Sequence, residues 1–548
     1  MSDAPISRRD LFVRSRDVGG LAAFATLLAG HAEANGEGRA DEAAAAQTPG
    51  ALRAGAPDVY TSLGVRPFIN ARGTYTILSG STMLPEVRAA MDQAARQYVH
   101  LDELTEAIGQ RLAALTCAEW GLVTSGCAAA LTHATAACVA GGNPDLHVRI
   151  PDLRGFAKDE VVIPKHSRNV YDAAIRAVGV RVVEATTRDE FEAALGPRTA
   201  MVYVLAGPQA DKSELNLAAL APLTRPRGVP ILVDAAAEIL TIPNVHLQNG
   251  ATLVGYSGGK CLRGPQTAGL LLGRKDLVKA AWVHSAPHHG FARGMKVGKE
   301  EAIGMLAAVE QWVRRDHDAE WRQWTAWLEK IAERVKKVDG IGVTTEIVQP
   351  VGLSNRTPTL KILWDRRALG FGGGAMALLL FQDEQRISLF PAQGDSEERT
   401  GVSITPYMLA PGDAAIIADR LYERLMSHGS RGHLQLPERR PPLADISGVW
   451  EVRIAYAASE ATHTLHLRQR GNTIDGSHQG DFVGRDLTGT IDADEMSVVS
   501  FYGEEHGDAL NYRFTGTVEG DTMKGSLDMG EYLKATWSAT RRERSSRR

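Results

Sequence analysis

The chain has 548 residues, of which 44% are hydrophobic and 23% are charged, and its formal net charge is −4. These values are ordinary for a globular protein, and the length is sufficient for two or three domains with a large core. The slightly acidic balance argues against a nucleic-acid partner, and no apolar run reaches the roughly 18 residues of an ordinary membrane span.

Residues 1–34 carry the features of an export signal. Ser7-Arg8-Arg9-Asp10-Leu11-Phe12 is a twin-arginine pattern, a weakly apolar stretch runs from Val18 to Gly30, and Ala32-Glu33-Ala34 offers a cleavage site. A plain basic tail is the alternative. Because the twin-arginine route carries folded proteins, the pattern predicts a periplasmic protein that acquires any cofactor in the cytoplasm. Residues 35–58, rich in Ala, Gly and Glu, are expected to form a flexible linker.

The next segments predict a helix and then a strand, a turn and a second helix. Leucines and Ile108 recur at helical spacing from Leu104 to Leu115. The strand Leu122-Val123 leads into Thr124-Ser125-Gly126-Cys127, a turn of small residues before an Ala-rich helix. Backbone N–H groups at a helix N-terminus attract phosphate, and small residues allow its close approach. A plain strand-to-helix turn is the alternative interpretation.

Strand and helix signals alternate farther along the chain. Strands are predicted at 160–164, 180–183 and 200–205, and helices at 188–195 and 216–223. This alternation indicates a mostly parallel α/β sheet, in which ligands bind beyond the carboxyl ends of the strands.

The stretch from Val229 to Gly269 holds the residues on which the functional interpretation depends. The apolar run Ile231-Leu232-Val233 ends at Asp234, and a second apolar run leads into Ser257-Gly258-Gly259-Lys260. Taken singly, such an aspartate usually forms a cap or a turn, and such a lysine is usually solvated. As a pair on consecutive strand ends, they suit an enzyme that uses pyridoxal 5'-phosphate (PLP), which needs a lysine for the Schiff base and an acid at the pyridinium nitrogen.

Several residues of interest are therefore expected at one edge of the sheet. Thr124, His166, Asp234 and Lys260 all lie at or just past the end of a predicted strand. Because the carboxyl ends of parallel strands share an edge, these side chains are expected to meet there.

The segment SGGKCLRGPQTAG, from Ser257 to Gly269, resembles the lysine segment of the selenocysteine synthase (SelA)-like family of fold-type I PLP enzymes. It resembles most the branch typified by D-glucosaminate-6-phosphate ammonia lyase. Selenocysteine synthases tend to carry Asp where this chain has Gly259. The resemblance runs from about Leu63 to about His428. It implies the fold of the aspartate aminotransferase-like PLP enzymes, with a small α+β C-terminal lobe, and a homodimer or larger homo-oligomer.

The resemblance also implies a role for individual residues. Lys260 would form the Schiff base and transfer protons, Asp234 would contact the pyridinium nitrogen, and His166 would stack on the cofactor ring. The remaining cofactor contacts are expected from Thr124, Ser125, Gly126, Cys127, Ala236 and Ser257. From their positions in the chain, a substrate carboxylate or phosphate is also expected at Arg168 and a substrate carboxylate at Arg386, while Arg263 and Gln266 are expected to hold phosphate or to contact the neighbouring subunit.

The rest of the chain predicts a packing layer and a separate β domain. Two long helices are expected between residues 300 and 338, with Trp312, Trp321, Trp324 and Trp327 as core residues. After residue 444, strands of period two and the echoed turns Gly471–Gly476 and Gly520–Gly525 predict an antiparallel barrel or sandwich. Its histidines His463, His466 and His478 are too scattered to predict a metal site.

The predicted organisation is a signal peptide (1–34), a linker (35–58), a PLP-binding large domain (59–335), a small lobe (336–428), a second linker (429–444) and an all-β accessory domain (445–548). The favoured activity is α,β-elimination from an amino acid or amino-sugar acid, with release of ammonia. Transfer at Cβ, racemisation and transamination use the same residues and stay open. An exported, non-catalytic binding protein is the alternative from another class.

Overall fold

The computed structural model describes residues 59–427, 439–502 and 510–542. The chain divides into two compact units, the first reaching to Leu434 apart from Arg168–Ala173, and the second running from Gln435 onward together with that short segment. The expected export signal and the linker at 35–58 lie outside the described residues. Within the described ranges, no helix combines the length and the apolar character needed to cross a bilayer.

The first unit is built on a seven-stranded sheet with the strand order β2-β8-β7-β6-β5-β3-β4. Strand β8 runs antiparallel to both of its neighbours, and all other pairs are parallel. The α/β prediction is therefore confirmed, and the carboxyl ends of β2, β3, β6 and β7 share one edge. The strands are β2 (Trp120–Thr124), β3 (Glu160–Pro164), β4 (Arg181–Ala185), β5 (Thr199–Leu205), β6 (Ile231–Asp234), β7 (Leu253–Ser257) and β8 (Gly269–Gly273).

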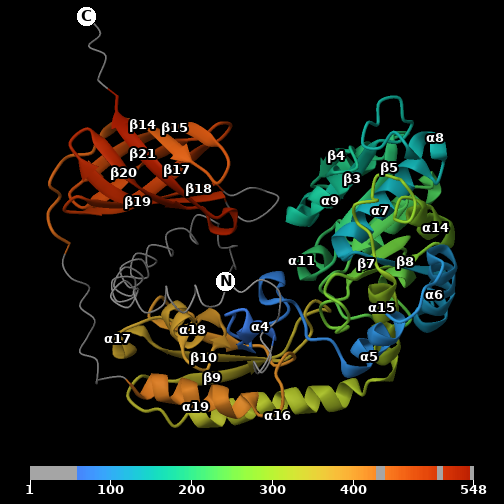
Figure 1. Ribbon diagram of the computed structural model, residues 1–548, viewed down its shortest axis with the longest axis horizontal. Coiled ribbons are helices and arrows are strands. Elements are labelled where there is room, and N and C mark those ends of the chain that lie inside the picture. The colour runs from blue at the N-terminus through green and yellow to red at the C-terminus, as the bar shows by residue number, and fades with distance from the viewer. Residues whose placement is uncertain (1–58, 428–438, 503–509, 543–548) are drawn as a thin grey trace, which may run out of the picture. The chain divides into compact units, whose positions relative to one another are not determined.

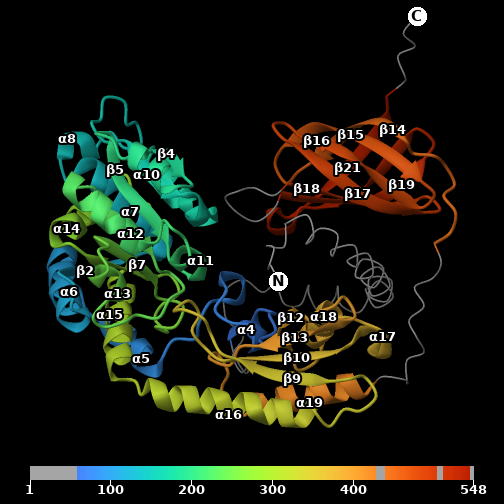
Figure 2. The same ribbon diagram turned by 180° about the vertical axis from the view of Figure 1, so that it is seen from behind.

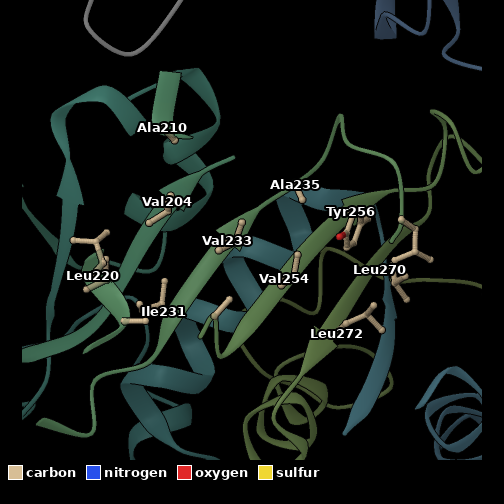
Figure 3. Close-up of a cluster of buried hydrophobic side chains, with 14 of the residues drawn as sticks. Val204, Ala210, Leu220, Ile231, Val233, Ala235, Val254, Tyr256, Leu270 and Leu272 are labelled. Atoms are coloured by element: carbon tan, nitrogen blue, oxygen red, sulfur yellow. The ribbon is translucent and has the colours of Figure 1, made fainter. Parts of the chain in front are cut away.

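The central strands are apolar on both faces because helices cover both sides of the sheet. Val204, Val233 and Val254, on adjacent strands, point to the same face, as Figure 3 shows. The residues that precede them on β6 and β7, Leu232 and Leu253, belong to the core of the opposite face. Each fully buried aliphatic side chain contributes about 1.5–3 kcal/mol, so this sheet is the main source of stability in the first unit.

Local signals in the sequence set the helix boundaries. Thr187 and Glu190 form a capping box at the start of α10, and the Asn216 side chain caps α12. Helix α4 (Val59–Ser62) lies beside the small lobe (Figure 1). The helices that accompany the large sheet are α5 (Pro85–Ala94), α6 (Leu101–Thr116), α7 (Cys127–Ala140), α8 (Pro144–His147), α9 (Ala173–Arg176), α10 (Arg188–Ala194), α11 (Pro208–Asp211), α12 (Leu217–Thr224), α13 (Val245–Gln248), α14 (Lys275–Val283) and α15 (Lys299–Arg314).

A smaller antiparallel sheet, with the order β12-β13-β10-β9, forms the C-terminal lobe of the first unit. Helices α16 and α19 lie along one face of it and α18 along the other (Figure 2). A short parallel pair, β1 with β11, ties the N-terminal segment to this lobe. The elements are β1 (Ile69–Asn70), α16 (His317–Val335), β9 (Thr344–Val348), β10 (Thr359–Asp365), α17 (Arg366–Leu369), α18 (Gly373–Gln382), β11 (Ile387–Ser388), β12 (Phe390–Gln393), β13 (Arg399–Ile404) and α19 (Asp413–Met426).

The second unit is a closed barrel of antiparallel strands, β14 to β21 in order (Figure 1). Pairing of β14 with β21 closes it, so the prediction of a barrel or sandwich resolves to a barrel. Trp450, Phe514 and Trp537 are buried in its interior. The strands are β14 (Gly448–Ala455), β15 (Glu460–Arg470), β16 (Thr473–Gln479), β17 (Gly484–Asp492), β18 (Glu495–Tyr502), β19 (Leu510–Glu519), β20 (Thr522–Asp528) and β21 (Lys534–Arg541).

Candidate active site

The shared edge of the large sheet gathers the side chains that the sequence indicated. Thr124 ends β2 and Asp234 ends β6. Ser257 ends β7, three residues before Lys260. His166 lies in the 3-10 turn Lys165–Ser167, directly after β3. The order of parallel strands thus places these residues together although they are far apart in the sequence.

Asp234 is a buried carboxylate, with 2% of its surface exposed. Its Oδ1 accepts hydrogen bonds from the Ala236 amide at 3.1 Å and the Cys127 thiol at 3.6 Å, and its Oδ2 accepts one from the Tyr203 hydroxyl at 3.0 Å. Burial raises the pKa of Asp234, while these three donors and the charge of Lys260 oppose the rise. None of the three donors carries a positive charge, so the carboxylate favours a cationic partner such as a protonated ring nitrogen.

The turn between β2 and α7 is held from several sides. The Thr124 hydroxyl donates to the Gly126 carbonyl at 2.9 Å, and the Ser125 hydroxyl donates to the Met295 carbonyl at 3.0 Å. Gly126 has φ 87°, a conformation that favours glycine, and no atom lies within 4 Å of the position a Cβ would take there. Open space at the N-terminus of α7 suits an oxyanion such as a phosphate.

Cys127 links this turn to the acid. Its Sγ reaches Asp234, and burial together with that carboxylate raises the pKa of the thiol well above its ordinary value. The thiol therefore stays protonated and donates to the carboxylate. The sequence predicted a backbone role for Cys127 in the turn, and the contact of its side chain with Asp234 is additional.

Gly269 on β8 packs directly against the turn. A Cβ at this position would lie 2.3 Å from the carbonyl carbon of Gly126 and 2.7 Å from the backbone nitrogen of Cys127. Any side chain there must push the backbone of the turn, because the clashing atoms are main-chain atoms.

We therefore expect Gly269→Ala to weaken PLP binding by about ten-fold or more, since such overpacking costs about 1–3 kcal/mol. The measurement is a titration of the purified variant with PLP, followed by absorbance. Gly196→Ala is the control, because no atom lies within 4 Å of a Cβ at that position. An unchanged affinity in Gly269→Ala contradicts a role of the turn in holding the cofactor.

The loop that carries Lys260 is closed by backbone hydrogen bonds. The Gly258 amide donates to the Ala268 carbonyl and the Gly264 amide to the Gly258 carbonyl, both at 2.8 Å. The Ser81 amide donates to the Gly259 carbonyl at 2.9 Å, so the N-terminal segment is attached to the same loop. Lys260 is partly exposed and follows β7, which pairs in parallel with β6, the strand that ends in Asp234.

His166 is held as a neutral ring. Its Nε2 lies 3.3 Å from the Leu215 carbonyl and its Nδ1 lies 3.0 Å from the Ser167 hydroxyl. Burial lowers the pKa of His166, so the imidazole is uncharged at neutral pH, as a stacking role requires. Ser167, fully buried, also accepts a hydrogen bond from the Leu205 amide and thereby anchors the turn.

The predicted substrate-binding residues have different surroundings. Arg263 donates to the Thr82 carbonyl at 3.0 Å, and Gln266 to the Thr76 carbonyl at 3.4 Å, so both lie where the N-terminal segment meets the lysine loop. Arg168 forms a buried ion pair with Asp172 at 2.7 Å. In the small lobe, Arg386 donates to two carbonyl groups, of Phe381 at 2.9 Å and Arg66 at 2.8 Å. The structure thus joins Arg263 and Gln266 to the lysine loop, and gives Arg168 and Arg386 partners elsewhere.

A cavity of about 1030 Å³ lies beside the lysine loop, and Cys261 and Arg263 belong to its wall. The prediction that the four tryptophans are core residues is correct for Trp312, which is 8% exposed. Trp327 is partly buried and packs against the core of the small lobe. The prediction is wrong for Trp321 and Trp324, which are partly exposed in the cavity wall. The aromatic side chains of this wall include Trp321, Trp324, Trp327 and Tyr407.

Two residues that the sequence analysis did not single out contribute to the site. Tyr203 was interpreted only as part of an apolar strand, yet its hydroxyl binds Asp234. The Tyr407 hydroxyl binds the Thr74 side chain at 2.8 Å. The sequence did offer an indication for Tyr203: it is a tyrosine in an otherwise aliphatic buried strand, and a buried hydroxyl needs a hydrogen-bond partner.

These observations fit PLP as the cofactor. A buried carboxylate without a cationic hydrogen-bond donor suits the pyridinium nitrogen, the open turn before α7 suits the phosphate, and Lys260 supplies the amine.

Known proteins support the same assignment. No protein-family model matches the chain. D-glucosaminate-6-phosphate ammonia lyase of Salmonella typhimurium is 33% identical over 294 residues, covering 52% of this chain and 77% of that protein. 5'-C-glycyluridine monooxygenase-decarboxylase of a Streptomyces species is 34% identical over 385 residues, covering 68% and 92%. L-seryl-tRNA(Sec) selenium transferase of Moorella thermoacetica is 29% identical over 306 residues, covering 48% and 59%.

A solved structure of D-glucosaminate-6-phosphate ammonia-lyase matches with a TM-score of 0.59 and 29% identity, covering 68% of this chain and 99% of that one. The match confirms the expected fold, and the relatives establish that the protein is an enzyme. The chain belongs to the SelA-like family of fold-type I PLP-dependent enzymes, the family of D-glucosaminate-6-phosphate ammonia lyase.

Proposed function

We propose that this enzyme removes ammonia from an amino acid or an amino-sugar acid by α,β-elimination. The single observation that carries the proposal is the pairing of β6 with β7, which places the buried Asp234 beside the strand that leads into the Lys260 loop. The chain is also 33% identical, over 294 residues, to an ammonia lyase. When bound, PLP supplies an electron sink for negative charge that develops at the substrate α-carbon.

Each residue of the site has a defined task in this proposal. The Nζ of Lys260 would hold the cofactor, and the same amine would take the proton from the substrate α-carbon. A free lysine has a pKa near ~10.4, so the amine acts as a base near neutral pH only when its environment lowers that value. Asp234, as a carboxylate, keeps the ring nitrogen protonated. His166, as a neutral imidazole, holds the ring in its plane.

The elimination is balanced without an oxidant. The α-carbon loses a proton, and the β-carbon loses its leaving group with the electron pair of the broken bond. The released unsaturated amine takes up water and yields a 2-keto acid and ammonia. Arg263 and Gln266, at the lysine loop, are placed to orient an anionic group of the substrate.

A second candidate is the oxidative loss of a carboxylate from an amino acid, with dioxygen as the co-reactant. The Streptomyces relative favours it, because the shared region covers 92% of a protein named as a monooxygenase-decarboxylase. Transfer at Cβ, racemisation and transamination would use the same lysine and acid.

The two candidates are separated by measuring ammonia, keto acid, dioxygen and carbon dioxide together. The holoenzyme is incubated with D- and L-amino acids and amino-sugar acids in a closed cell. Ammonia and keto acid in equal amounts, without dioxygen uptake, are expected for at least one substrate. Dioxygen uptake matched by carbon dioxide supports the second candidate instead, and no turnover by a PLP-loaded protein contradicts both.

A further inference from the structure

The interior of the C-terminal barrel contains a polar cluster near one end. Successive strands contribute His463 on β15, His478 on β16, Arg485 on β17, Ser500 on β18 and Tyr512 on β19. The register places His478 opposite Arg485 and Ser500 opposite Tyr512. His463, His478, Arg485 and Ser500 are between 0% and 7% exposed.

Most of this cluster satisfies its own hydrogen bonds. His463 Nδ1 lies 2.8 Å from His478 Nε2, and His478 Nδ1 lies 2.7 Å from the Ser500 hydroxyl. Burial, with His463 and Arg485 nearby, lowers the pKa of His478 to about 3, and burial also lowers that of His463. Both imidazoles are therefore neutral at pH 7, and the guanidinium of Arg485 supplies the positive charge of the cluster.

Arg485 is a buried arginine of the barrel, with 7% of its surface exposed. Among the residues that the structure describes, its buried Nε has no hydrogen-bond partner, and its Nη1 makes one long contact, 3.4 Å to the Val483 carbonyl. Its guanidinium carbon lies 4.8 Å from the centre of the Tyr512 ring. In the described part of the barrel it has no ion pair, whereas Arg468, for example, is paired with Asp475. A buried charge in this condition is costly unless a ligand neutralises it.

We propose that Arg485 anchors a binding site for a small oxyanion, a carboxylate or a phosphate, at this end of the barrel. Guanidinium N–H groups bind such anions in pairs, and a barrel of eight strands is wide enough to hold one small ligand. The rest of the interior is filled by apolar side chains, which restricts the ligand to a compact molecule.

His463 and Gly480 lie in the same region as the Arg485 guanidinium. His463 Nε2 lies 3.7 Å from Asp481 Oδ2, too far for a hydrogen bond, and the Asp481 side chain is 57% exposed. The imidazole is thus able to donate to an anion once its other nitrogen accepts from His478. A Cβ at Gly480 would lie 2.6 Å from Arg485 Nη1, so this glycine makes room for the guanidinium.

The site is tested on the full-length holoenzyme by calorimetric titration with acetate, inorganic phosphate and acetamide, the neutral counterpart of acetate. Wild type is expected to bind acetate or phosphate, but not acetamide. Arg485→Gln removes the charge, and Gly480→Ala displaces the guanidinium but keeps it. Both are expected to bind the anion at least about ten-fold more weakly, a loss of about 1.4 kcal/mol. Arg468→Gln is the matched control on an exposed arginine and should bind like wild type.

The outcomes separate the sources of the anion and test the site itself. Binding of acetate alone identifies a carboxylate ligand, and binding of phosphate alone identifies a phosphate ligand. Urea unfolding adds a second readout, because the anion should stabilise wild type but not Arg485→Gln. Absence of anion binding by wild type, or equal binding by wild type and both site variants, overturns the proposal in favour of a structural arginine. The same holds if the anion fails to stabilise wild type.

Discussion

Lys260→Ala is expected to abolish turnover and the visible absorbance of bound PLP. In the proposed function the Lys260 amine holds the cofactor covalently and takes the substrate proton, and alanine removes that amine. Loss of a positioned base alone costs about 10²–10⁴-fold in rate. No second lysine follows the end of β7, whose next residues are Gly258 and Gly259. The measurements are the absorbance spectrum after incubation with PLP and the rate of ammonia release.

Lys279→Ala is the matched control for this experiment. Lys279 is an exposed lysine of the same unit, and its Nζ lies 3.0 Å from Glu106. It should keep both the absorbance and the activity of wild type. If Lys260→Ala retained the visible band, Lys260 would not be the lysine that holds the cofactor.

The large sheet was predictable because its signals are local. The apolar runs at 160–164, 200–205 and 231–233 are short and bounded by turn residues, and each became a buried strand. Parallel strands bring their carboxyl ends to one edge, so Asp234 and Lys260 were expected near each other from the sequence alone. The site residues whose positions depend only on strand order could therefore be predicted from the sequence.

Contacts between side chains of different strands were not accessible in this way. The hydroxyl of Tyr203 reaches Asp234 because β5 and β6 pair in one register, and a shift by one residue would turn it to the opposite face. The Cys127 thiol reaches Asp234 because α7 packs on the sheet. A local sequence pattern determines neither the register of paired strands nor the packing of a helix on a sheet.

The barrel illustrates the same limit. Alternation and hairpin turns predicted its strands, but closure depends on the pairing of the first strand with the last. His463, His466 and His478 were interpreted as too scattered for a metal site, and no local pattern showed that the β15–β16 hairpin brings His463 Nδ1 within 2.8 Å of His478 Nε2. The role proposed for Arg485 depends on its burial, and the alternating pattern of its strand does not predict that a charged residue is buried.

Asp234→Asn is expected to lower turnover by about 10²–10³-fold, the usual cost of removing one preorganised electrostatic group from an active site. The amide keeps the shape of the carboxylate and still accepts from the Tyr203 hydroxyl, but it offers no negative charge to the ring nitrogen. Covalent attachment through Lys260 should persist, so the variant is expected to retain a visible band while it loses activity. Activity equal to wild type would exclude Asp234 from the proposed role.

Tyr203→Phe tests the same carboxylate through its pKa. The Tyr203 hydroxyl lowers the pKa of Asp234, so its removal raises that pKa. Because the reaction requires the ionised carboxylate, the acid limb of the profile of kcat/KM against pH should move to higher pH, with activity near neutral pH less affected than in Asp234→Asn. Tyr256→Phe is the control, since that buried hydroxyl binds Asn244 and not Asp234. If the acid limb moves equally in both variants, or in neither, Asp234 is not the group whose protonation limits the reaction at low pH.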